Sequence, residues 1–434
     1  MRQHVLTSLC LLADLIKADI PAAPKRYSVP ARRLNTGLER RAQDGVEATQ
    51  HVVVDFDFGG QRIPLSLDSG STYTWVASTL VEDPPKLPTL YNPDISTTFH
   101  VDQDPTNRKC ANSDIDCITG NEDVSVGGLT AKGMVFGVAR KVGDGVFNSG
   151  QAGTLGLGRQ SGLPSKWLSR DVPFWYRAGA NLEMPYLFAF DIYQDRNGTV
   201  DFGFLDTTKF TGEIVFVPVN TSMSNWNFEM EGYAIGNGSM QDATPFKGVV
   251  DSGGPNIGLP SEVVRPYFAS FGGTPSSGNS HTFPCSAYPP PDLRLRLKGG
   301  HELVLNGTFL AQAKSRGTTC KGRLDDSKQT GYNIGASVLD QKYVVLDHQN
   351  LRIGFANKRH EGDPEGVLPA SSTTTSPSPS VSASDAATAP SDTVSSTPPP
   401  GASATNKPDS RGVVMRPRSV HACICTVALL VFLI

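Results

Sequence analysis

The sequence predicts a mostly β protein, with two related lobes and a central cleft between them. Short β-rich runs recur from about His51 to Ala356, and glycine (43) and proline (32) separate them. In addition, Asp68-Ser69-Gly70-Ser71 is repeated, a whole lobe further along the chain, as Asp251-Ser252-Gly253-Gly254. An apolar strand running into Asp-Ser-Gly places a carboxylate on a tight turn, where glycine lets two backbones approach closely. The repeat therefore indicates a duplicated domain that brings two carboxylates face to face.

Two facing carboxylates have a specific chemistry. They cannot both ionise at short range, so they share one proton. The ionised member can deprotonate a water molecule while the protonated member donates to a carbonyl oxygen. Asp68 and Asp251 are therefore the expected catalytic pair of an enzyme that hydrolyses peptide bonds at acid pH, with no metal or other cofactor.

Composition and other motifs exclude several alternatives. The sequence contains no Gly-rich phosphate loop, no Cys/His spacing typical of metal sites and no Gly-x-Ser-x-Gly elbow. The formal net charge is −3 and only 19% of the residues are charged, so nothing favours nucleic acid as a partner.

The N-terminal residues have features of targeting and processing. Residues 1–23 are expected to form a signal peptide, because a basic start and a short apolar run precede small residues, although Asp14 interrupts the run. The alternative is an amphipathic N-terminal segment. Residues 24–41 are expected to form a short propeptide, in which Arg32-Arg33 and Arg40-Arg41 are either processing sites or solvated basic residues.

The N-terminal lobe is expected at 42–218 and the C-terminal lobe at 219–360. β-forming runs bounded by Gly, Pro, Asn or Asp predict the strands of the first lobe at His51–Phe58, Arg62–Leu67, Thr74–Ala77, Asp123–Val126, Gly133–Val138, Tyr186–Asp191, Thr199–Phe204 and Glu213–Pro218. The same pattern predicts those of the second lobe at Asn227–Tyr233, Phe246–Val250, Asp292–Leu297, His301–Leu305, Lys342–Asp347 and Leu351–Phe355. Helices are expected only at Ser261–Phe271 and near Ser337–Asp340.

The C-terminal residues indicate a stalk and a lipid anchor. Residues 361–409 are rich in Ser, Thr, Pro and Ala, a composition that cannot bury a core and is typical of a linker or an O-glycosylated stalk. Ala422–Ile434 is nearly all apolar but too short to span a bilayer. Residues 410–434 therefore predict a GPI-attachment signal with Ser410 as the attachment residue. The alternative is a tail-anchor helix or an irregular tail. We accordingly expect a protein of the secretory pathway, held at the cell surface by lipid.

Cysteines and sequons fit an oxidising compartment. Outside the two targeting segments the cysteines are Cys110, Cys117, Cys285 and Cys320, and their spacing suggests the local pairs Cys110–Cys117 and Cys285–Cys320. Four cysteines allow three connectivities, and sequence alone does not choose between them. Glycosylation sequons begin at Asn197, Asn220, Asn237 and Asn306.

Several further segments, together with the two tetrads, resemble a pepsin-like aspartic protease of the secreted or GPI-anchored fungal type. These segments are Thr74-Trp75-Val76, Tyr91–Phe99, Asp123–Gly128, Phe136–Ala139, Gly153–Gly158, Asn333-Ile334-Gly335, Tyr343–Asp347 and Ile353–Ala356. The resemblance implies peptide or protein substrates and a Cys285–Cys320 disulfide, and we expect a monomer.

The same resemblance assigns roles within the tetrads. Asp68 and Asp251 would be catalytic, and Ser69 and Ser252 would cross between the lobes to hold the two turns beside Gly70 and Gly253. By the same resemblance, the hydroxyl of Ser71 would hydrogen-bond to its own aspartate.

Two departures from the family's pattern affect the expected activity. The second tetrad ends in Gly254, where the family has Thr or Ser, so a hydroxyl that should support Asp251 is missing. The flap region, Lys109–Glu122, contains no tyrosine, although Trp75, the usual neighbour of the flap tyrosine, is retained. A closing flap excludes water and holds the substrate. The alternative function is therefore a protease-like surface protein that binds peptides or partners with weak or no catalysis. A structural adhesin fits poorly, because the stalk is a small part of the chain.

Overall fold

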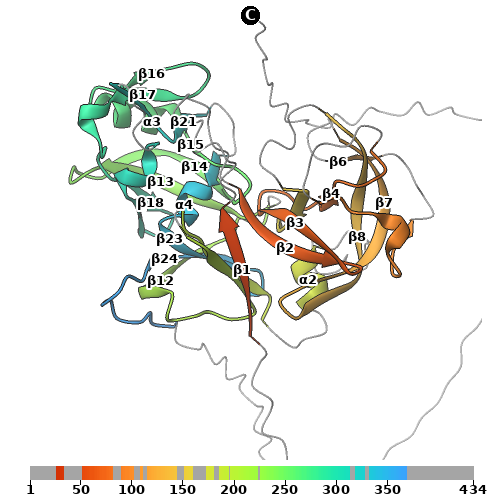
Figure 1. The fold of residues 1–434 in the computed structure, drawn as a ribbon. Coiled ribbons are helices and arrows are strands. Elements are labelled where there is room, and N and C mark those ends of the chain that lie inside the picture. Colours follow the sequence, from red (N-terminus) through yellow and green to blue (C-terminus); the bar gives the residue numbers. More distant parts are fainter. Residues whose placement is uncertain are drawn as a thin grey trace, which may run out of the picture. The chain divides into compact units, whose positions relative to one another are not determined.

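Strands dominate the part of the chain that the structure describes (Figure 1). The computed structural model describes residues 26–33, 51–81, 89–101, 108–110, 115–143, 151–159, 173–179, 185–194, 196–222, 225–312, 318–327 and 332–368. The predicted signal peptide, most of the predicted stalk, Arg40-Arg41 and Ser410 lie outside these residues. Within the described ranges, no helix is both long and apolar enough to cross a membrane.

The largest sheet has fourteen strands and draws on both predicted lobes. In sheet order it contains β12 (Phe210–Pro218), β24 (Arg352–Lys358), β23 (Lys342–Asp347), β10 (Leu187–Asp191), β11 (Gly198–Phe202), β1 (Tyr27–Arg33), β2 (Val52–Phe58), β3 (Gln61–Asp68), β9 (Gly153–Gly156), β4 (Trp75–Val76), β8 (Leu129–Val142), β7 (Ile115–Val126) and β5 (His100–Val101). A further short strand, β6 (Arg108–Cys110), pairs with β7.

Two smaller sheets and the helices complete the second lobe. The seven-stranded sheet runs β19 (Glu302–Leu305), β18 (Leu293–Leu297), β13 (Asn227–Ile235), β14 (Gln241–Asp251), β22 (Tyr332–Gly335), β15 (Ile257–Leu259) and β21 (Leu324–Asp326). The three-stranded sheet runs β16 (Thr274–Pro275), β17 (His281–Pro284) and β20 (Thr319–Lys321). The described α-helices are α2 (Phe174–Gly179), α3 (Ser261–Ala269) and α4 (Ala336–Leu339), and the short 3-10 helices are η2 (Pro93–Ile95), η3 (Cys285–Ala287) and η4 (Gly307–Leu310).

The strand topology repeats between the lobes. In the first lobe β3 runs parallel to β9, and β4 pairs with β9 in the antiparallel sense. In the second lobe β14 runs parallel to β22, and β15 pairs antiparallel with β22. The registers match as well, because Asp68 lies opposite Gly156 and Asp251 lies opposite Gly335. The duplication inferred from the repeated tetrad is therefore present in the fold.

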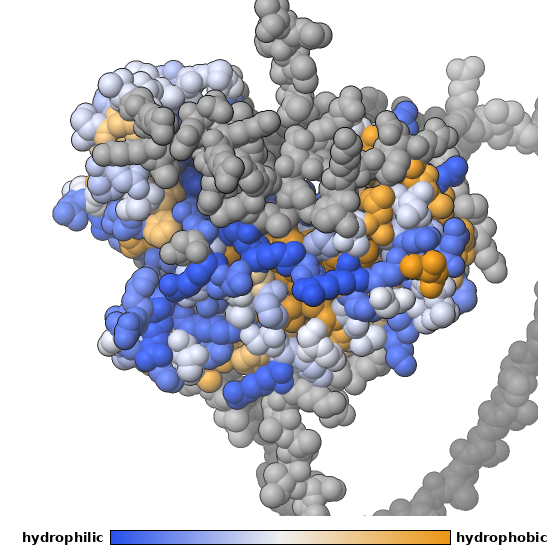
Figure 2. Space-filling view, viewed as in Figure 1, coloured by the Kyte–Doolittle hydropathy of each residue, from blue (hydrophilic) through white to orange (hydrophobic). Residues whose placement is uncertain are grey.

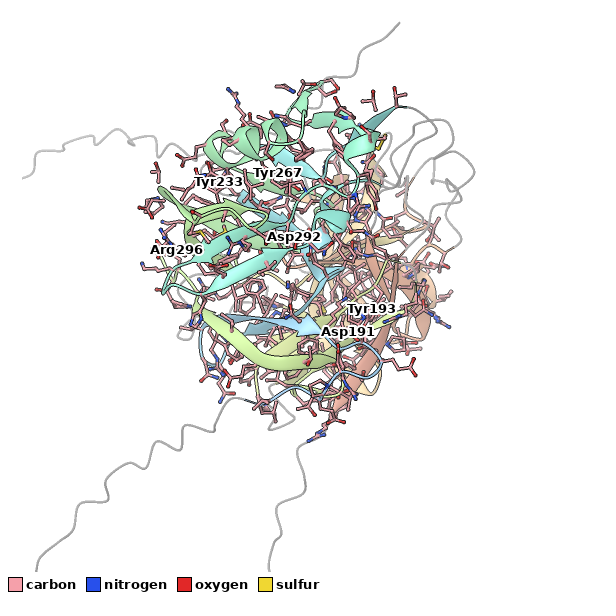
Figure 3. The ribbon with its side chains drawn as sticks, turned by 90° about the vertical axis from the view of Figure 1, so that its left-hand side faces the viewer. Asp191, Tyr193, Tyr233, Tyr267, Asp292 and Arg296 are labelled. Carbon is pink, nitrogen blue, oxygen red and sulfur yellow. A yellow bond between two sulfur atoms is a disulfide. The ribbon has the colours of Figure 1, made fainter. Side chains whose placement is uncertain are left out.

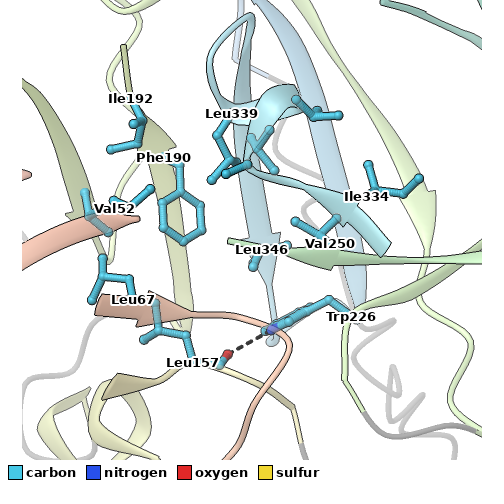
Figure 4. Packing of buried hydrophobic residues seen from close by; sticks show 14 of the residues in the cluster. Val52, Leu67, Leu157, Phe190, Ile192, Trp226, Val250, Ile334, Leu339 and Leu346 are labelled. Carbon is cyan, nitrogen blue, oxygen red and sulfur yellow. Dashed lines mark hydrogen bonds between the residues drawn. The ribbon is translucent and has the colours of Figure 1, made fainter. Parts of the chain in front are cut away.

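Apolar side chains of both lobes pack together next to the two tetrads (Figure 4). Leu67 and Val250, which directly precede the two aspartates, are both buried. Leu157 and Ile334 are buried in the same cluster. Trp226 is fully buried, and its indole N–H donates to the Leu157 carbonyl oxygen at 2.9 Å. This contact ties the second lobe to the residue that directly follows β9, the strand beside Asp68.

A further group of ionisable side chains is buried at the ends of β10 and β24. Asp191 and Tyr193 lie close together in Figure 3. Lys358 has its Nζ atom 3.9 Å from the centre of the Tyr193 ring and donates to the Ile192 carbonyl. Burial lowers the pKa of Lys358 to about 7 and raises the pKa of Asp191. These charged groups belong to the interior, whereas the coloured surface in Figure 2 is mostly hydrophilic with smaller apolar areas.

The strand β1 contains one of the two predicted dibasic pairs. It pairs with β11 and with β2, and it lies between the two groups of strands in Figure 1. The Arg33 side chain is 2% exposed, forms an ion pair with the fully buried Asp340 and donates to the Ala336 carbonyl at 3.1 Å. Arg32 donates to Asp55 at 2.7 Å. Arg33 is therefore not a solvated residue, and the bond that follows Arg32 lies within a paired strand.

Candidate active site

The two tetrads meet with their carboxylates in contact. Asp68 ends β3 and Asp251 ends β14, and the two side chains are hydrogen-bonded to each other. A Cβ atom on Gly70 would lie 2.7 Å from Oδ1 of Asp251, and one on Gly253 would lie 2.7 Å from Cγ of Asp68. Each glycine is therefore required by the carboxylate of the opposite lobe, which is the close approach that the motif predicts.

Ser69 and Ser252 cross between the lobes. The Ser69 N–H donates to Oγ of Ser252 at 3.0 Å, and the Ser252 N–H donates to Oγ of Ser69 at 2.9 Å. The Ser69 hydroxyl donates to the Val250 carbonyl at 2.7 Å, and the Ser252 hydroxyl donates to the Leu67 carbonyl at 2.8 Å. Both serines are fully buried. These four bonds fix the two turns to each other and hence fix the separation of the carboxylates.

The two carboxylates hold their charge unequally. Backbone N–H groups of Gly70 and Ser71 donate to Asp68, the former at 2.8 Å. Burial, reinforced by the neighbouring Asp251 carboxylate, raises the pKa of Asp68 to about 8. Burial also raises the pKa of Asp251, but hydrogen bonds from Asp68, Gly253 and Gly254 favour its ionised form. The pair therefore shares one proton, and the hydrogen bonds to Asp251 favour the charge on that carboxylate.

The fourth residue of each tetrad does not supply a hydroxyl to its aspartate. The Ser71 hydroxyl accepts from the Tyr73 N–H at 3.3 Å, so the expected bond from this hydroxyl to Asp68 is replaced by a bond from the Ser71 backbone. Gly254 likewise donates through its backbone, to Oδ1 of Asp251 at 3.2 Å. The other oxygen of Asp251, Oδ2, accepts from Nδ2 of Asn333 at 2.8 Å. Sequence reasoning missed Asn333, whose only local signal is a polar residue on an otherwise apolar strand.

A family model for eukaryotic aspartyl proteases matches residues 57–358, which include both tetrads. The chain belongs to this family. It is 28% identical to penicillopepsin-3 of Penicillium janthinellum over 327 residues, which are 71% of this chain and 79% of that protein. It is 31% identical to endothiapepsin of Cryphonectria parasitica over 309 residues, and 30% identical to aspergillopepsin-1 of Aspergillus flavus over 318. These matches cover 69% of this chain each, and 72% and 75% of the two relatives.

Membership of the eukaryotic aspartyl protease family confirms the predicted fold class and the resemblance to fungal pepsin-like enzymes. It also makes the chain an aspartic-type endopeptidase, with peptides or proteins as substrates. No group of three or more His, Cys, Asp or Glu side chains is placed to bind a metal ion in the described part of this protease.

The hairpin of β6 and β7 lies in the segment, Lys109–Glu122, that the sequence predicts to be the flap. Trp75 is 5% exposed and packs in one cluster with Ile115 and Cys117 of β7, so the hairpin lies against the expected neighbour. The chain has no tyrosine between Tyr91 and Tyr176, and therefore none in this hairpin. Residues 111–114, between the two strands, lie outside the described residues.

The cysteines of the protease fall into two separate groups. Cys285 and Cys320 form a disulfide with a Cα–Cα distance of 5.0 Å. Cys117 is also disulfide-bonded, and its partner is neither of these two. The Cys110 side chain lies outside the described residues, so the pair Cys110–Cys117 stays a prediction.

The predicted glycosylation sites lie at the surface of the protease. The sequon asparagines Asn197, Asn237 and Asn306 are exposed, and Asn220 is partly exposed. A glycan can therefore be accommodated at three of the four sites without unfolding the chain locally.

Proposed function

We propose that this chain is a cell-surface endopeptidase that acts on the acid side of neutrality. The observation that carries the proposal is the hydrogen-bonded pair of Asp68 and Asp251, held by the crossed serines. The ionised Asp251 takes a proton from a water molecule as that water attacks the peptide carbonyl carbon. The protonated Asp68 donates its proton to the carbonyl oxygen, which produces a tetrahedral gem-diol. Asp251 then passes the proton it took from water to the amide nitrogen while Asp68 takes one back from a hydroxyl of the gem-diol, so that the C–N bond breaks, the amine leaves and the pair returns to its starting state.

The pH dependence follows from the shared proton. Activity requires exactly one proton on the pair, so it falls at low pH when Asp251 is protonated and at high pH when Asp68 is deprotonated. Because burial and the Asp251 charge raise the pKa of Asp68, the decline on the alkaline side is expected at a higher pH than an ordinary carboxyl group would give. Hydrolysis of a mixed peptide library across pH 3 to 8 tests this. Asp68→Asn and Asp251→Asn should each cost several orders of magnitude, and activity that survives Asp251→Asn would remove the pair from the mechanism.

The cell-surface location is supported by sequence features at both ends of the chain. These are the signal-like residues 1–23, the Ser/Thr/Pro-rich residues 361–409 and the apolar Ala422–Ile434. The exposed sequons and the Cys285–Cys320 disulfide also suit passage through the secretory pathway. Phosphatidylinositol-specific phospholipase should release the protein from membranes, and truncation before Ser410 should send it to the medium. Protein that stays membrane-bound after lipase treatment, with Ala422–Ile434 still attached, would show that the tail is itself an anchor.

A second candidate function is peptide binding with weak or no catalysis. The tyrosine-free hairpin that packs on Trp75 favours it, because a flap without this side chain makes fewer contacts with a substrate. The peptide-library assay separates the two functions when it is run with and without a statine-type inhibitor. Inhibitor-sensitive hydrolysis supports the protease. Peptide binding without hydrolysis at any pH supports the binding protein.

A further inference from the structure

Asn333 contacts the candidate catalytic pair from outside both tetrads. It lies on β22, where it is opposite Val249 of the parallel strand β14. Its Nδ2 donates to Oδ2 of Asp251 at 2.8 Å, while Oδ1 of Asp251 accepts from the backbone of Gly253 and Gly254. Asp251 thus has a protein donor on each of its two oxygens. The Asn333 residue itself is exposed, so the contact does not serve to satisfy a buried amide.

Gly254 leaves the space in which this contact is made. A Cβ atom at position 254 would lie 2.9 Å from Oδ2 of Asp251 and 3.5 Å from Nδ2 of Asn333. The φ angle of Gly254 is not positive, so the backbone does not require glycine there. A side chain at 254 and the amide of Asn333 therefore compete for the same carboxylate oxygen, and this chain uses the amide.

The topological counterpart of Asn333 in the first lobe makes no such contact. Thr154 lies two residues before Gly156 on β9, as Asn333 lies two residues before Gly335 on β22. Within the described residues, no hydrogen bond joins the Thr154 side chain to Asp68, whose protein donors are the backbone N–H groups of Gly70 and Ser71. The extra donor is thus confined to Asp251. A hydrogen bond from an amide to a carboxylate favours the ionised form.

We propose that Asn333 is a positioning residue that replaces the hydroxyl missing at position 254 and holds Asp251 as the ionised base of the pair. Its effect on the rate of hydrolysis rests on the proposed peptidase function, whereas its effect on the ionisation of Asp251 does not. Asn333 orients the Oδ2 atom, and it lowers the free energy of the state in which Asp68 carries the shared proton. The absence of Thr or Ser at position 254 then does not imply an unsupported Asp251.

The kinetic test uses Asn333→Leu, which keeps the size of the side chain and removes the donor. Removing a hydrogen bond to a charged group should lower kcat by about 10-fold and shift the acid limb of the pH profile to higher pH by roughly 1 unit. KM should change little. Thr154→Val is the matched control at the equivalent position of the other lobe, and its acid limb should not move. A profile for Asn333→Leu that coincides with that of the wild type would overturn the proposal.

A second-site change tests whether the amide and a hydroxyl are interchangeable. Gly254→Ser should lower activity in the wild type, because its Cβ displaces Oδ2 of Asp251 while the amide is still present. In the Asn333→Ala background the same change should recover part of the lost activity and return the acid limb toward lower pH. If Asn333 only stabilises β22, Gly254→Ser will be equally harmful in both backgrounds, and the proposal fails.

A readout without substrate separates this proposal from the proposed function. Removing the donor raises the pKa of Asp251 in the folded state, so Asn333→Leu should lower the melting temperature more at pH 7 than at pH 3. A purely structural role would lower it equally at both pH values and would overturn the inference. If the wild type hydrolyses no peptide but the pH-dependent difference appears, the proposed function fails while the role of Asn333 stands.

Discussion

Asp68→Asn is expected to abolish activity and yet to stabilise the folded protein at pH 7. Burial and the Asp251 charge raise the pKa of Asp68 from 3.8 to about 8. A carboxyl group with a raised pKa contributes most stability below its unfolded pKa, and this contribution is lost as the pH rises toward the folded pKa, because the unfolded chain releases the proton first. Asparagine keeps the shape of the side chain but does not ionise. The loss of stability with rising pH should therefore be absent from the variant.

The magnitude follows from the same pKa values. A pH of 7 lies about 3 units above the pKa of the carboxyl group in the unfolded chain. At roughly 1.36 kcal/mol per unit, protonating this group on folding costs about 4 kcal/mol. Asp68 is partly exposed, and solvent screening reduces the figure to about 2 kcal/mol. Near pH 3 the carboxyl is protonated in both states, and the variant should match the wild type.

Thermal unfolding at several pH values between 3 and 8 measures this effect. The melting temperature of Asp68→Asn should exceed that of the wild type by a few degrees at pH 7 and converge with it at pH 3. Asp347→Asn is the control, because Asp347 is a buried carboxylate that accepts from Arg352 at 2.8 Å. It should destabilise at pH 7. Equal or lower stability of Asp68→Asn at pH 7 would refute the view that the pair stores unfavourable charge.

Three further predictions concern the contacts that hold the site in place. Ser69→Ala and Ser252→Ala each remove a hydroxyl that both accepts and donates a hydrogen bond between the lobes. Each should lower the free energy of unfolding in urea by about 2–4 kcal/mol, and wild-type stability in either variant would show that the crossing has no structural role. Arg33→Met should lower the free energy of unfolding by about 3–5 kcal/mol, because Asp340 is left buried without its cation. In the native wild type, trypsin should not cleave this strand. Replacing Cys285 and Cys320 by serine should cost about 2–4 kcal/mol by calorimetry, and an unchanged melting temperature would mean that the disulfide contributes nothing.

The sequence predicted best what depends on local pattern. The repeated tetrad placed Asp68 and Asp251 together, because each motif fixes a strand end and the repetition implies that the two lobes are related. Individual elements followed for the same reason: the predicted strand Asp292–Leu297 matches β18, Leu293–Leu297, and the helix expected at Ser261–Phe271 begins at Ser261 and ends at Ala269. In each of these cases the pattern of apolar residues and turn formers is contained in the element itself.

What escaped prediction depends on contacts between distant residues. The strand β1 contains two arginines, which favour solvent, and in the structure they form ion pairs with Asp55 and Asp340. Asn333 contacts Asp251 across 82 positions, and no local pattern indicates that contact. The strand β7 was predicted only over its last residues, because Gly120 interrupts the β pattern. In the structure a Cβ atom at position 120 would lie 2.3 Å from the Phe99 ring, so only glycine fits there.

The crossing of Ser69 and Ser252 also restricts how the lobes can move. Four hydrogen bonds join the lobes at the point where the carboxylates meet, so a translation that separated the lobes there would break all four together. A small rotation about this point keeps the bonds. It changes the separation of the lobes more, the farther a residue lies from the crossing. A relative motion of the lobes that keeps these four bonds therefore has its axis at the reactive centre. The outer contacts with a peptide can adapt to its size while the two carboxylates keep one fixed separation.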